Sequence, residues 1–419
     1  MAQLGGLLGI ADLRKRMLFT LAMIAVFRFG AHIPVAGVDP ARLAELFGRG
    51  NLLSLIDLFT GGALIRFSIF AMGIVPYINA SIIIQLLTVV IPQLEQLAKE
   101  SESGRRQLAQ YTRYLTIALA IFQATGMAFW LRGVLQPGVS FPLFLVSAVV
   151  SLTAGSALVL WISELMTENG IGNGASLLIF IGIVARIPAY IGQTVTLVKG
   201  GASLTGVIIL AAVFIAMIVA IVIVQEAQRK VPVQYAKRVV GRKVYGGQST
   251  YLPLRINQGG VIPIIFASSV LLFPATIAQF VPNDFIRSIA ALFSPSGSLY
   301  MVLYFVLIFF FTYFYTAITF NPNELADNIK KYGGFIMGIR PGKPTAEFLE
   351  YTITRLTLVG ALFLALVAII PVIVEGATRI TSFQGLGGTA LLIVVGVALD
   401  LVRQIETHLI TRQYEGILG

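Results

Sequence analysis

The chain has 419 residues, of which 57% are hydrophobic and only 12% are charged. Its mean hydropathy is +0.87, and a soluble protein would carry roughly twice that charged fraction. This composition excludes a soluble globular protein and predicts an integral membrane protein. The chain has no cysteine and only two histidines, His32 and His408, which lie far apart. We therefore expect no disulfide, no bound metal and no other cofactor.

Ten apolar stretches predict ten membrane-spanning helices, because each approaches the about 20 residues needed to cross a bilayer. They cover residues 17–35, 68–91, 114–131, 141–162, 174–191, 204–225, 260–281, 299–320, 353–374 and 386–402. The basic stretch DLRKRM (12–17) precedes the first of them. We interpret it as the flank of a retained span, because no small-residue cleavage site of a secretory signal follows it.

The placement of the basic residues predicts the orientation in the membrane. With an inner amino terminus, 20 of the 30 Lys and Arg residues lie in inner segments and seven lie in outer loops. Because positively charged loops stay on the cytosolic side, both termini are expected to be cytosolic. The remaining Arg28, Arg186 and Arg355 fall near span ends, where a long side chain can reach the polar interface.

No acidic residue falls in the middle of a predicted span, since Glu226 and Asp400 lie at inner ends. An ion-coupled secondary transporter is expected to keep ionisable or carbonyl-rich sites at the bilayer midplane. This pattern argues against a transporter without excluding one. An intramembrane protease would need membrane aspartates or a serine beside a histidine, and that class is disfavoured more strongly.

The stretch LLSLIDLFTGGALIRFS (52–68), just before the second span, is apolar but carries Asp57, Arg66 and two adjacent glycines. It is too short and too charged to cross a bilayer. Each glycine weakens a helix by about 1 kcal/mol relative to alanine, so the pair is expected to act as a hinge. From the residues alone, the stretch is interpreted as a re-entrant or interfacial helix on the outer side.

Two long inner loops, 226–259 and 321–352, carry basic, glycine-containing tips, GRKVYGG (241–247) and GIRPGKPT (338–345). They could serve only to fix the topology, or they could project into the cytosol as docking arms for a large anionic partner. Topology alone needs far fewer residues, so their length favours docking arms.

Longer motifs closely resemble the SecY family, the channel subunits of the bacterial protein-conducting translocon. The resemblance runs in order through about residues 8–416. The segments that carry it are FSIFAMGIVPYINASIIIQLLTVV (67–90), SGRRQLAQYTRY (103–114), GIGNGASLLIF (170–180), QSTYLPLRINQGGVIPIIFASSVLLFPATIA (248–278), FNPNELADNIKKYGGFIMGIRPGKPT (320–345) and TRLTLVGALFLALVAIIP (354–371).

The resemblance implies an all-α polytopic membrane protein, with ten transmembrane helices around an hourglass pore. The helices would form two inverted five-helix halves, residues 1–192 and 193–419. The outer segment at about 52–66 would be a short plug helix that closes the resting pore. Its central residues are Leu55, Ile56, Asp57, Leu58, Phe59, Gly61 and Gly62.

The resemblance also implies a pore constriction and a lateral gate. The constriction positions are Ile74, Ile78, Ala175, Ile179, Ile265 and Ile393. Ala175 departs from the bulky aliphatic residue usual there, which would leave a wider or more plug-dependent seal. The gate positions between helices 2 and 3 and helices 7 and 8 are Asn79, Gln123, Ser269 and Phe273. Asn79 replaces a common serine, and we expect Pro76, Pro263 and Pro274 to kink the gate helices.

The cytosolic positions that match the family's docking sites are Arg105, Arg106, Arg242, Lys243 and Arg340. The implied partners are SecE-type and SecG-type small membrane subunits, the SecA motor ATPase and the ribosome. Signal peptides, unfolded preproteins and the lipid bilayer would be its other contacts. The chain has no G-x-x-x-x-G-K-[ST] phosphate loop, so it is expected not to be an enzyme, and a partner must supply the energy.

The function implied is a protein-conducting channel that passes unfolded secretory chains and releases transmembrane segments sideways into lipid. The expected location is the bacterial plasma membrane, although these residues do not separate it from a thylakoid membrane.

Overall fold

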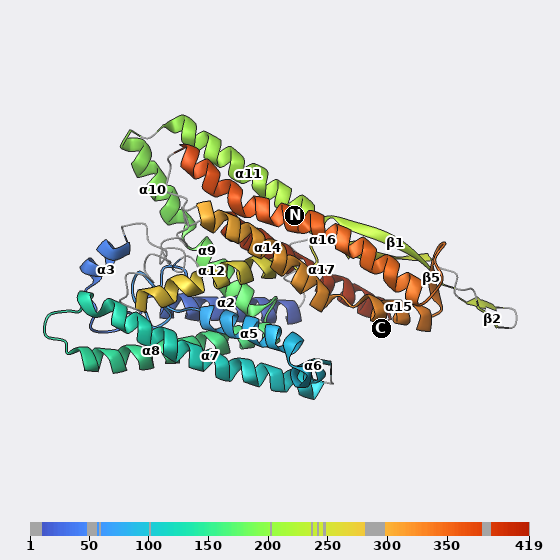
Figure 1. The fold of residues 1–419 in the computed structure, drawn as a ribbon, viewed down its shortest axis with the longest axis horizontal. Helices are drawn as coiled ribbons and strands as arrows, with labels where there is room; N and C mark the ends of the chain where they lie inside the picture. Colours follow the sequence, from blue (N-terminus) through green and yellow to red (C-terminus); the bar gives the residue numbers. More distant parts are fainter. Residues whose placement is uncertain are drawn as a thin grey trace.

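In the computed structural model, long helices run roughly along the long axis of the molecule, and a small sheet projects at one end (Figure 1). We call this end the sheet end. The structure describes residues 11–47, 57, 60–99, 102–201, 203–235, 238–240, 243–245, 249–280, 298–378 and 387–418.

The helices before residue 200 form one group that packs through neighbouring pairs such as α5 with α7 and α7 with α8. They are α2 (Ala11–Gly30), α3 (Pro40–Phe47), α5 (Val75–Val90), α6 (Pro92–Lys99), α7 (Glu102–Trp130), the short 3-10 helix η1 (Leu131–Val134), α8 (Phe141–Asn169), α9 (Gly174–Val184) and α10 (Ile187–Lys199).

The later helices form the second group, in which α14 lies between α12 and α16. They are α11 (Leu204–Glu226), α12 (Ile262–Phe280), α14 (Ser298–Thr319), α15 (Pro322–Lys331), α16 (Lys343–Thr378) and α17 (Gly388–Leu418).

The expected spans all overlap helices of the structure. Within the described ranges, and with α9 and α10 counted together, seven helical segments are long and apolar enough to cross a membrane, and the pair α5–α6, bent by 104°, makes an eighth. Helices α2 and α12 occupy the other two expected positions. The span expected at 174–191 is broken at Ala185 and Arg186 into α9 and α10.

Side-chain caps fix where three helices begin. The Asn173 side chain accepts a hydrogen bond from Ser176 N (3.1 Å), and the Ser203 hydroxyl accepts one from Gly206 N (3.4 Å). Asn321 accepts from two backbone N–H groups at the start of α15. Such caps satisfy N–H groups that have no partner within the helix.

The second span begins later than the sequence predicts. The apolar window starts at residue 68, but α5 begins only at Val75, and residues 61–74 form mostly consecutive turns. Gly61, Gly62 and Gly73 have positive φ angles of 67°, 88° and 54°, and buried Phe67 has a φ of 46°. A left-handed backbone interrupts a right-handed helix, so hydropathy alone overestimated the length of the helix.

The kinks expected at Pro76 and Pro263 are not found, because both prolines lie at helix starts. Pro76 and Pro263 each occupy the second position of their helix, α5 and α12. In the first turn a proline removes no intrahelical hydrogen bond. These prolines therefore help to begin the two helices and do not bend their interiors.

The two long loops are joined by a small antiparallel sheet that the sequence did not predict. Its strand order is β4 (Ser249–Arg255), β1 (Gln228–Tyr235), β5 (Gly334–Ile336). A separate ribbon pairs β2 (Arg238–Val240) with β3 (Lys243–Tyr245). One face of the sheet packs on α15 and α16 through Val231, Val233, Leu254, Ile329, Ile336, Leu349 and Ile353.

Close contact between helix α8 and the turn segment depends on one glycine. A Cβ atom at Gly155 would overlap the carbonyl oxygen of Ile69. Gly192, in α10, is exposed and has nothing within 4 Å of the corresponding Cβ position. The two glycines differ in packing although both are helical.

Gly155→Ala is expected to lower the free energy of unfolding by about 1–3 kcal/mol, because the new methyl group forces backbone apart. The matched change Gly192→Ala should be neutral or stabilise by about 1 kcal/mol through helix propensity. Thermal unfolding of the purified protein in detergent would measure both. Equal melting temperatures for the two variants would contradict the packing assignment.

Candidate functional site

The six positions expected to form the constriction gather in one hydrophobic cluster. Four of them are buried in it: Ile74, Ile179, Ile265 and Ile393, with exposed fractions of 3%, 2%, 9% and 0%. Ile78 and Ala175 are partly buried and pack against the same cluster. We call these six residues the ring.

Helical spacing explains why the ring converges. Ile74 and Ile78 are four residues apart at the start of α5, and Ala175 and Ile179 are four apart on α9, so each pair shares one helix face. Ile265 comes from α12 and Ile393 from α17. The ring thus draws on elements from both ends of the chain. Its groups offer no ligand to a hydrated ion.

The plug segment is described only in part. Leu55, Ile56, Leu58 and Phe59 lie outside the described residues, whereas Asp57 and Thr60 are helical and completely buried. Asp57 Oδ1 accepts a hydrogen bond from Ile65 N (2.9 Å), and the Thr60 hydroxyl donates to the Asp57 carbonyl oxygen (3.1 Å). The segment therefore closes a compact loop around the Asp57 carboxylate.

Two arginines hold this segment from neighbouring helices. Arg186, at the break between α9 and α10, donates from Nη1 to Asp57 Oδ2 and lies over the Tyr190 ring at 5.6 Å from its centroid. Arg28, in the last turn of α2, donates from Nη1 to the Gly61 carbonyl oxygen (2.9 Å). The sequence placed Arg28 and Arg186 near span ends but did not predict these contacts. Both are site residues that the sequence reading missed.

The glycines of the segment have different roles. A Cβ atom at Gly61 would lie 2.9 Å from Gly182 Cα, so this glycine allows the segment to touch the α9 backbone. Gly62 has free space around it and is required only by its positive φ. The turns begin directly after Thr60, where the sequence predicted a hinge.

The expected lateral gate corresponds to a contact between helix groups. Helix α12 packs against both α5 and α7. Asn79 on α5, Gln123 on α7 and Ser269 on α12 are all half-buried. Phe273 lies in α12, but its side chain is not among those described.

The expected docking residues lie on exposed surfaces where they are described. Arg105 is exposed, and Arg106 forms an ion pair with Glu102 at 2.8 Å one helical turn away. Arg340 is exposed, and its carbonyl oxygen accepts a hydrogen bond from the Thr345 hydroxyl (2.9 Å). Lys243 belongs to β3, with its side chain outside the described set, and Arg242 is not described.

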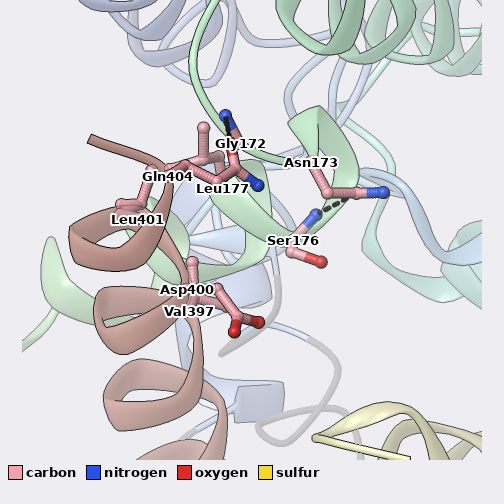
Figure 2. A pocket seen from close by; sticks show the side chains of 8 residues that line it. All are labelled: Gly172, Asn173, Ser176, Leu177, Val397, Asp400, Leu401 and Gln404. Carbon is pink, nitrogen blue, oxygen red and sulfur yellow. Dashed lines mark hydrogen bonds between the residues drawn. The ribbon is translucent and has the colours of Figure 1, made fainter. Parts of the chain in front are cut away.

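A small pocket of about 60 Å³ lies between the start of α9 and α17 (Figure 2). It is lined by Gly172, Asn173, Ser176, Leu177, Val397, Asp400, Leu401 and Gln404. Leu177 and Val397 also belong to the central cluster, so the pocket adjoins the ring. Gln404 Oε1 accepts a hydrogen bond from Gly172 N (2.7 Å) and ties the two elements together.

An aliphatic ring thus lies inside a helical bundle, next to a buried segment that does not span it. Solved structures share this fold. A structure described as "The structure of a protein conducting channel" superposes with a TM-score of 0.66 over 94% of this chain and 92% of that one, at 18% identity. Sec61 in a canine ribosome-channel complex gives a TM-score of 0.62 over the same shares, at 16% identity.

Sequence comparison gives the particular family. The family profile described as SecY matches residues 68–402. The protein translocase subunit SecY of Synechococcus elongatus is 48% identical, over 97% of this chain and 95% of its own length. The same subunit of Thermotoga maritima is 47% identical, over 98% and 96%. The chain belongs to the SecY family. It is a protein-conducting channel subunit of a multi-pass membrane type, and this family is one of channels and not of enzymes.

The buried pair of Asp57 and Arg186 yields a stability prediction. Asp57→Asn should lower the free energy of unfolding by about 3 kcal/mol, because removing one partner leaves the other charge uncompensated. The double variant Asp57→Asn/Arg186→Gln should lose less than the sum of the two single changes. Chemical or thermal unfolding in detergent would measure these differences.

The exposed pair of Arg106 and Glu102 provides the matched control. Their side chains are 77% and 81% exposed, so Glu102→Gln should change stability by less than about 1 kcal/mol. If Asp57→Asn and Glu102→Gln had the same small effect, the plug segment would not be held by its ion pair.

Proposed function

We propose that the ring is the constriction through which unfolded secretory polypeptides pass. The observation that carries this proposal is the convergence of the six ring residues, from α5, α9, α12 and α17, into one cluster. A collar of aliphatic side chains favours dewetting and excludes hydrated ions. Side-chain rotamers can rearrange around a passing chain, and the small Ala175 makes this collar more dependent on its plug.

The segment at about 52–66 acts as the plug of the resting channel. Its support is the burial of Asp57 and the contacts made by Arg186 and Arg28. These contacts come from α2 and from the α9–α10 break, next to the central cluster that contains Phe27 and Ile183. Opening the channel then requires these polar contacts to break.

The contact of α12 with α5 and α7 is the lateral gate, through which transmembrane segments and signal peptides leave the pore for lipid. Asn79, Gln123, Ser269 and Phe273 would face this seam. Hydrogen bonds between helices in a bilayer contribute only about 0.6 kcal/mol each. A seam closed by such contacts can open when a partner and a signal sequence bind. The gate separates two halves, residues 1–192 and 193–419.

The sheet end is the cytosolic docking side of the channel, with both chain termini in the cytosol of a bacterium and the protein in its plasma membrane. Arg105, Arg106, Arg242, Lys243 and Arg340 supply positive charge there. Anionic ribosomal RNA would be attracted by such charge, and a related Sec61 channel is described in a ribosome complex. A SecA-type motor would dock on the same side, and SecE-type and SecG-type subunits would complete the channel.

The test of this function is reconstitution in vesicles with the motor ATPase and the small partner subunits. A signal-bearing preprotein should become protease-protected only when ATP is present. Arg340→Glu should slow this protection by about tenfold, because reversing a charge at a docking surface adds repulsion. Arg42→Glu, at an exposed site in α3, is the matched control and should have no effect. No protection with the wild-type chain and an active motor would defeat the proposal.

The ring assignment makes a separate prediction about ion conductance. The double change Ile78→Gly/Ile265→Gly should raise the conductance of the resting channel in planar bilayers, because it widens and wets the collar. Deleting residues 55–62 in addition should raise it further.

Ile215 on α11 is 63% exposed on the outside of the bundle, so Ile215→Gly is the control and should not leak. Wild-type conductance in the double ring variant would show that the constriction lies elsewhere.

A further inference from the structure

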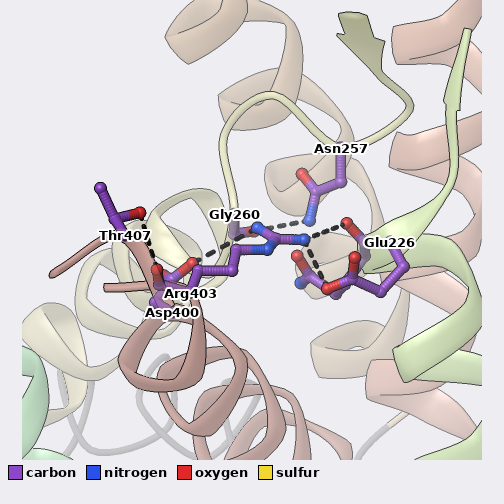
Figure 3. A network of polar contacts seen from close by, with 7 residues as sticks. Glu226, Asn257, Gly260, Asp400, Arg403 and Thr407 are labelled. Atoms are coloured by element: carbon purple, nitrogen blue, oxygen red, sulfur yellow. Dashed lines mark hydrogen bonds and ion pairs between the residues drawn. The ribbon is translucent and has the colours of Figure 1, made fainter. Parts of the chain in front are cut away.

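The middle of α17 binds the point where the sheet leaves the helical bundle (Figure 3). Arg403 Nη2 donates to the Gln225 carbonyl oxygen at 3.0 Å and to Glu226 Oε1 at 2.7 Å. Arg403 Nη1 also lies 3.6 Å from Asp400 Oδ1 on its own helix. Gln225 and Glu226 are the final residues of α11, so the guanidinium satisfies a carbonyl group that has no partner in the helix.

The same point is directly connected to helix α12. Ala227, after α11, accepts a hydrogen bond at its carbonyl oxygen from Ile256 N (3.1 Å), which follows β4. Strand β1 starts there and β4 ends there, and the first residue pair between them is Gln228 with Arg255. A short link, residues 256–261, then leads into α12, and the Asn257 side chain closes it by donating to the Gly260 carbonyl oxygen (2.9 Å).

Two long helices, α16 and α17, pack closely against this link. A Cβ atom at Gly360 of α16 would lie 2.7 Å from the Ile256 carbonyl oxygen, and one at Gly396 of α17 would lie 2.6 Å from Val261 Cγ1. Val261 is itself buried at 7% exposure. Because the link is short and has backbone or side chains on these sides, a displacement of the sheet cannot be absorbed there without moving the first turn of α12.

We call the end of α11 and the link 256–261 the joint. Within the described part of the chain, the hydrogen bonding of this joint is incomplete. The Gln225 side-chain nitrogen and the Asn257 side-chain oxygen are buried, and neither has a hydrogen-bond partner among the residues that the structure describes. The two side chains are 8% and 4% exposed. An unsatisfied buried donor and acceptor cost free energy. A joint that contains them is less strongly held in one arrangement than a fully bonded one, which suits a part that moves.

We infer that Arg403 is a positioning residue that ties the root of the docking sheet to α17, so that a push on the sheet moves the gate helix α12. This inference rests on the docking and gate roles proposed above and names the residues that connect them. The bond to the Gln225 carbonyl is the important one, because Glu226 is 52% exposed and an exposed ion pair contributes little.

The test measures the gate directly while the motor is bound. The chain has no native cysteine, so nitroxide labels can be placed at Val90 on α5 and Val270 on α12, which are 75% and 37% exposed. Their separation is measured by pulsed electron resonance in the complete channel complex in nanodiscs, with and without the motor ATPase and ATP. Motor binding is measured in parallel.

In the wild type, we expect a population with a longer distance between the two labels when the motor and ATP are added. Arg403→Met roughly keeps the length of the side chain but removes its hydrogen-bond donors. It should reduce the fraction of channels with the longer label distance by roughly tenfold, while motor binding is unchanged. Asn257→Ala, which opens the link at a second place, should have the same effect. Arg403→Lys keeps a donor for the carbonyl and should retain the longer distance. Glu226→Gln leaves the carbonyl bond intact and should retain it too.

Glu406→Gln, at an exposed position one turn further along α17, is the matched control and should behave as the wild type. Arg403→Met and Asn257→Ala channels that both open like the wild type would overturn the inference. Loss of motor binding in Arg403→Met would also overturn it, because Arg403 would then act on docking. A wild-type channel that binds no motor and never shows the longer distance would refute the proposed function itself, and the inference with it.

Discussion

The structure depends on the contact of aliphatic side chains that have nothing to offer water or ions. Ile74, Ile179, Ile265 and Ile393 meet at the centre of the bundle, where polar groups would instead stabilise a water column. Apolar packing is non-directional, and its favourable free energy is similar for any apolar partner of similar shape. If the ring is the constriction proposed above, the same property that makes a seal also lets the seal re-form after a chain of any sequence has passed.

Polar contacts are placed around this apolar cluster and hold the segments that are proposed to move. Asp57 is buried against Arg186, and Gly61 is bound by Arg28. Removing one partner of a buried ion pair costs several kcal/mol, because the other charge is left unpaired. Replacing both partners by well-packed apolar residues often costs little stability. The ion pair gives the plug segment one defined position without binding it irreversibly. Arg403 gives the root of the sheet a defined position in the same way.

The sheet joins two loops that lie far apart in the sequence into one structural unit. Val233 of β1 pairs with Ile336 of β5, more than one hundred residues later in the chain. Their loops were both expected to be docking arms, and pairing gives them a shared apolar base on α15 and α16. Strand β5 escaped sequence analysis because it has only three residues and its pairing is non-local. A rigid arm of this kind can pass a force to the helices at its root.

The sequence by itself determined the class of the protein, the number and order of its apolar helices and the family, because hydropathy and long matching motifs are properties of consecutive residues. Through that family it also named six candidate ring positions, whose role as the constriction stays a prediction. Tertiary structure alone decided that Asp57 meets Arg186, that α5 begins at Val75 and that Arg403 caps α11. These features depend on left-handed backbone angles and on charges from remote helices, and neither has a periodic signature in the amino-acid sequence.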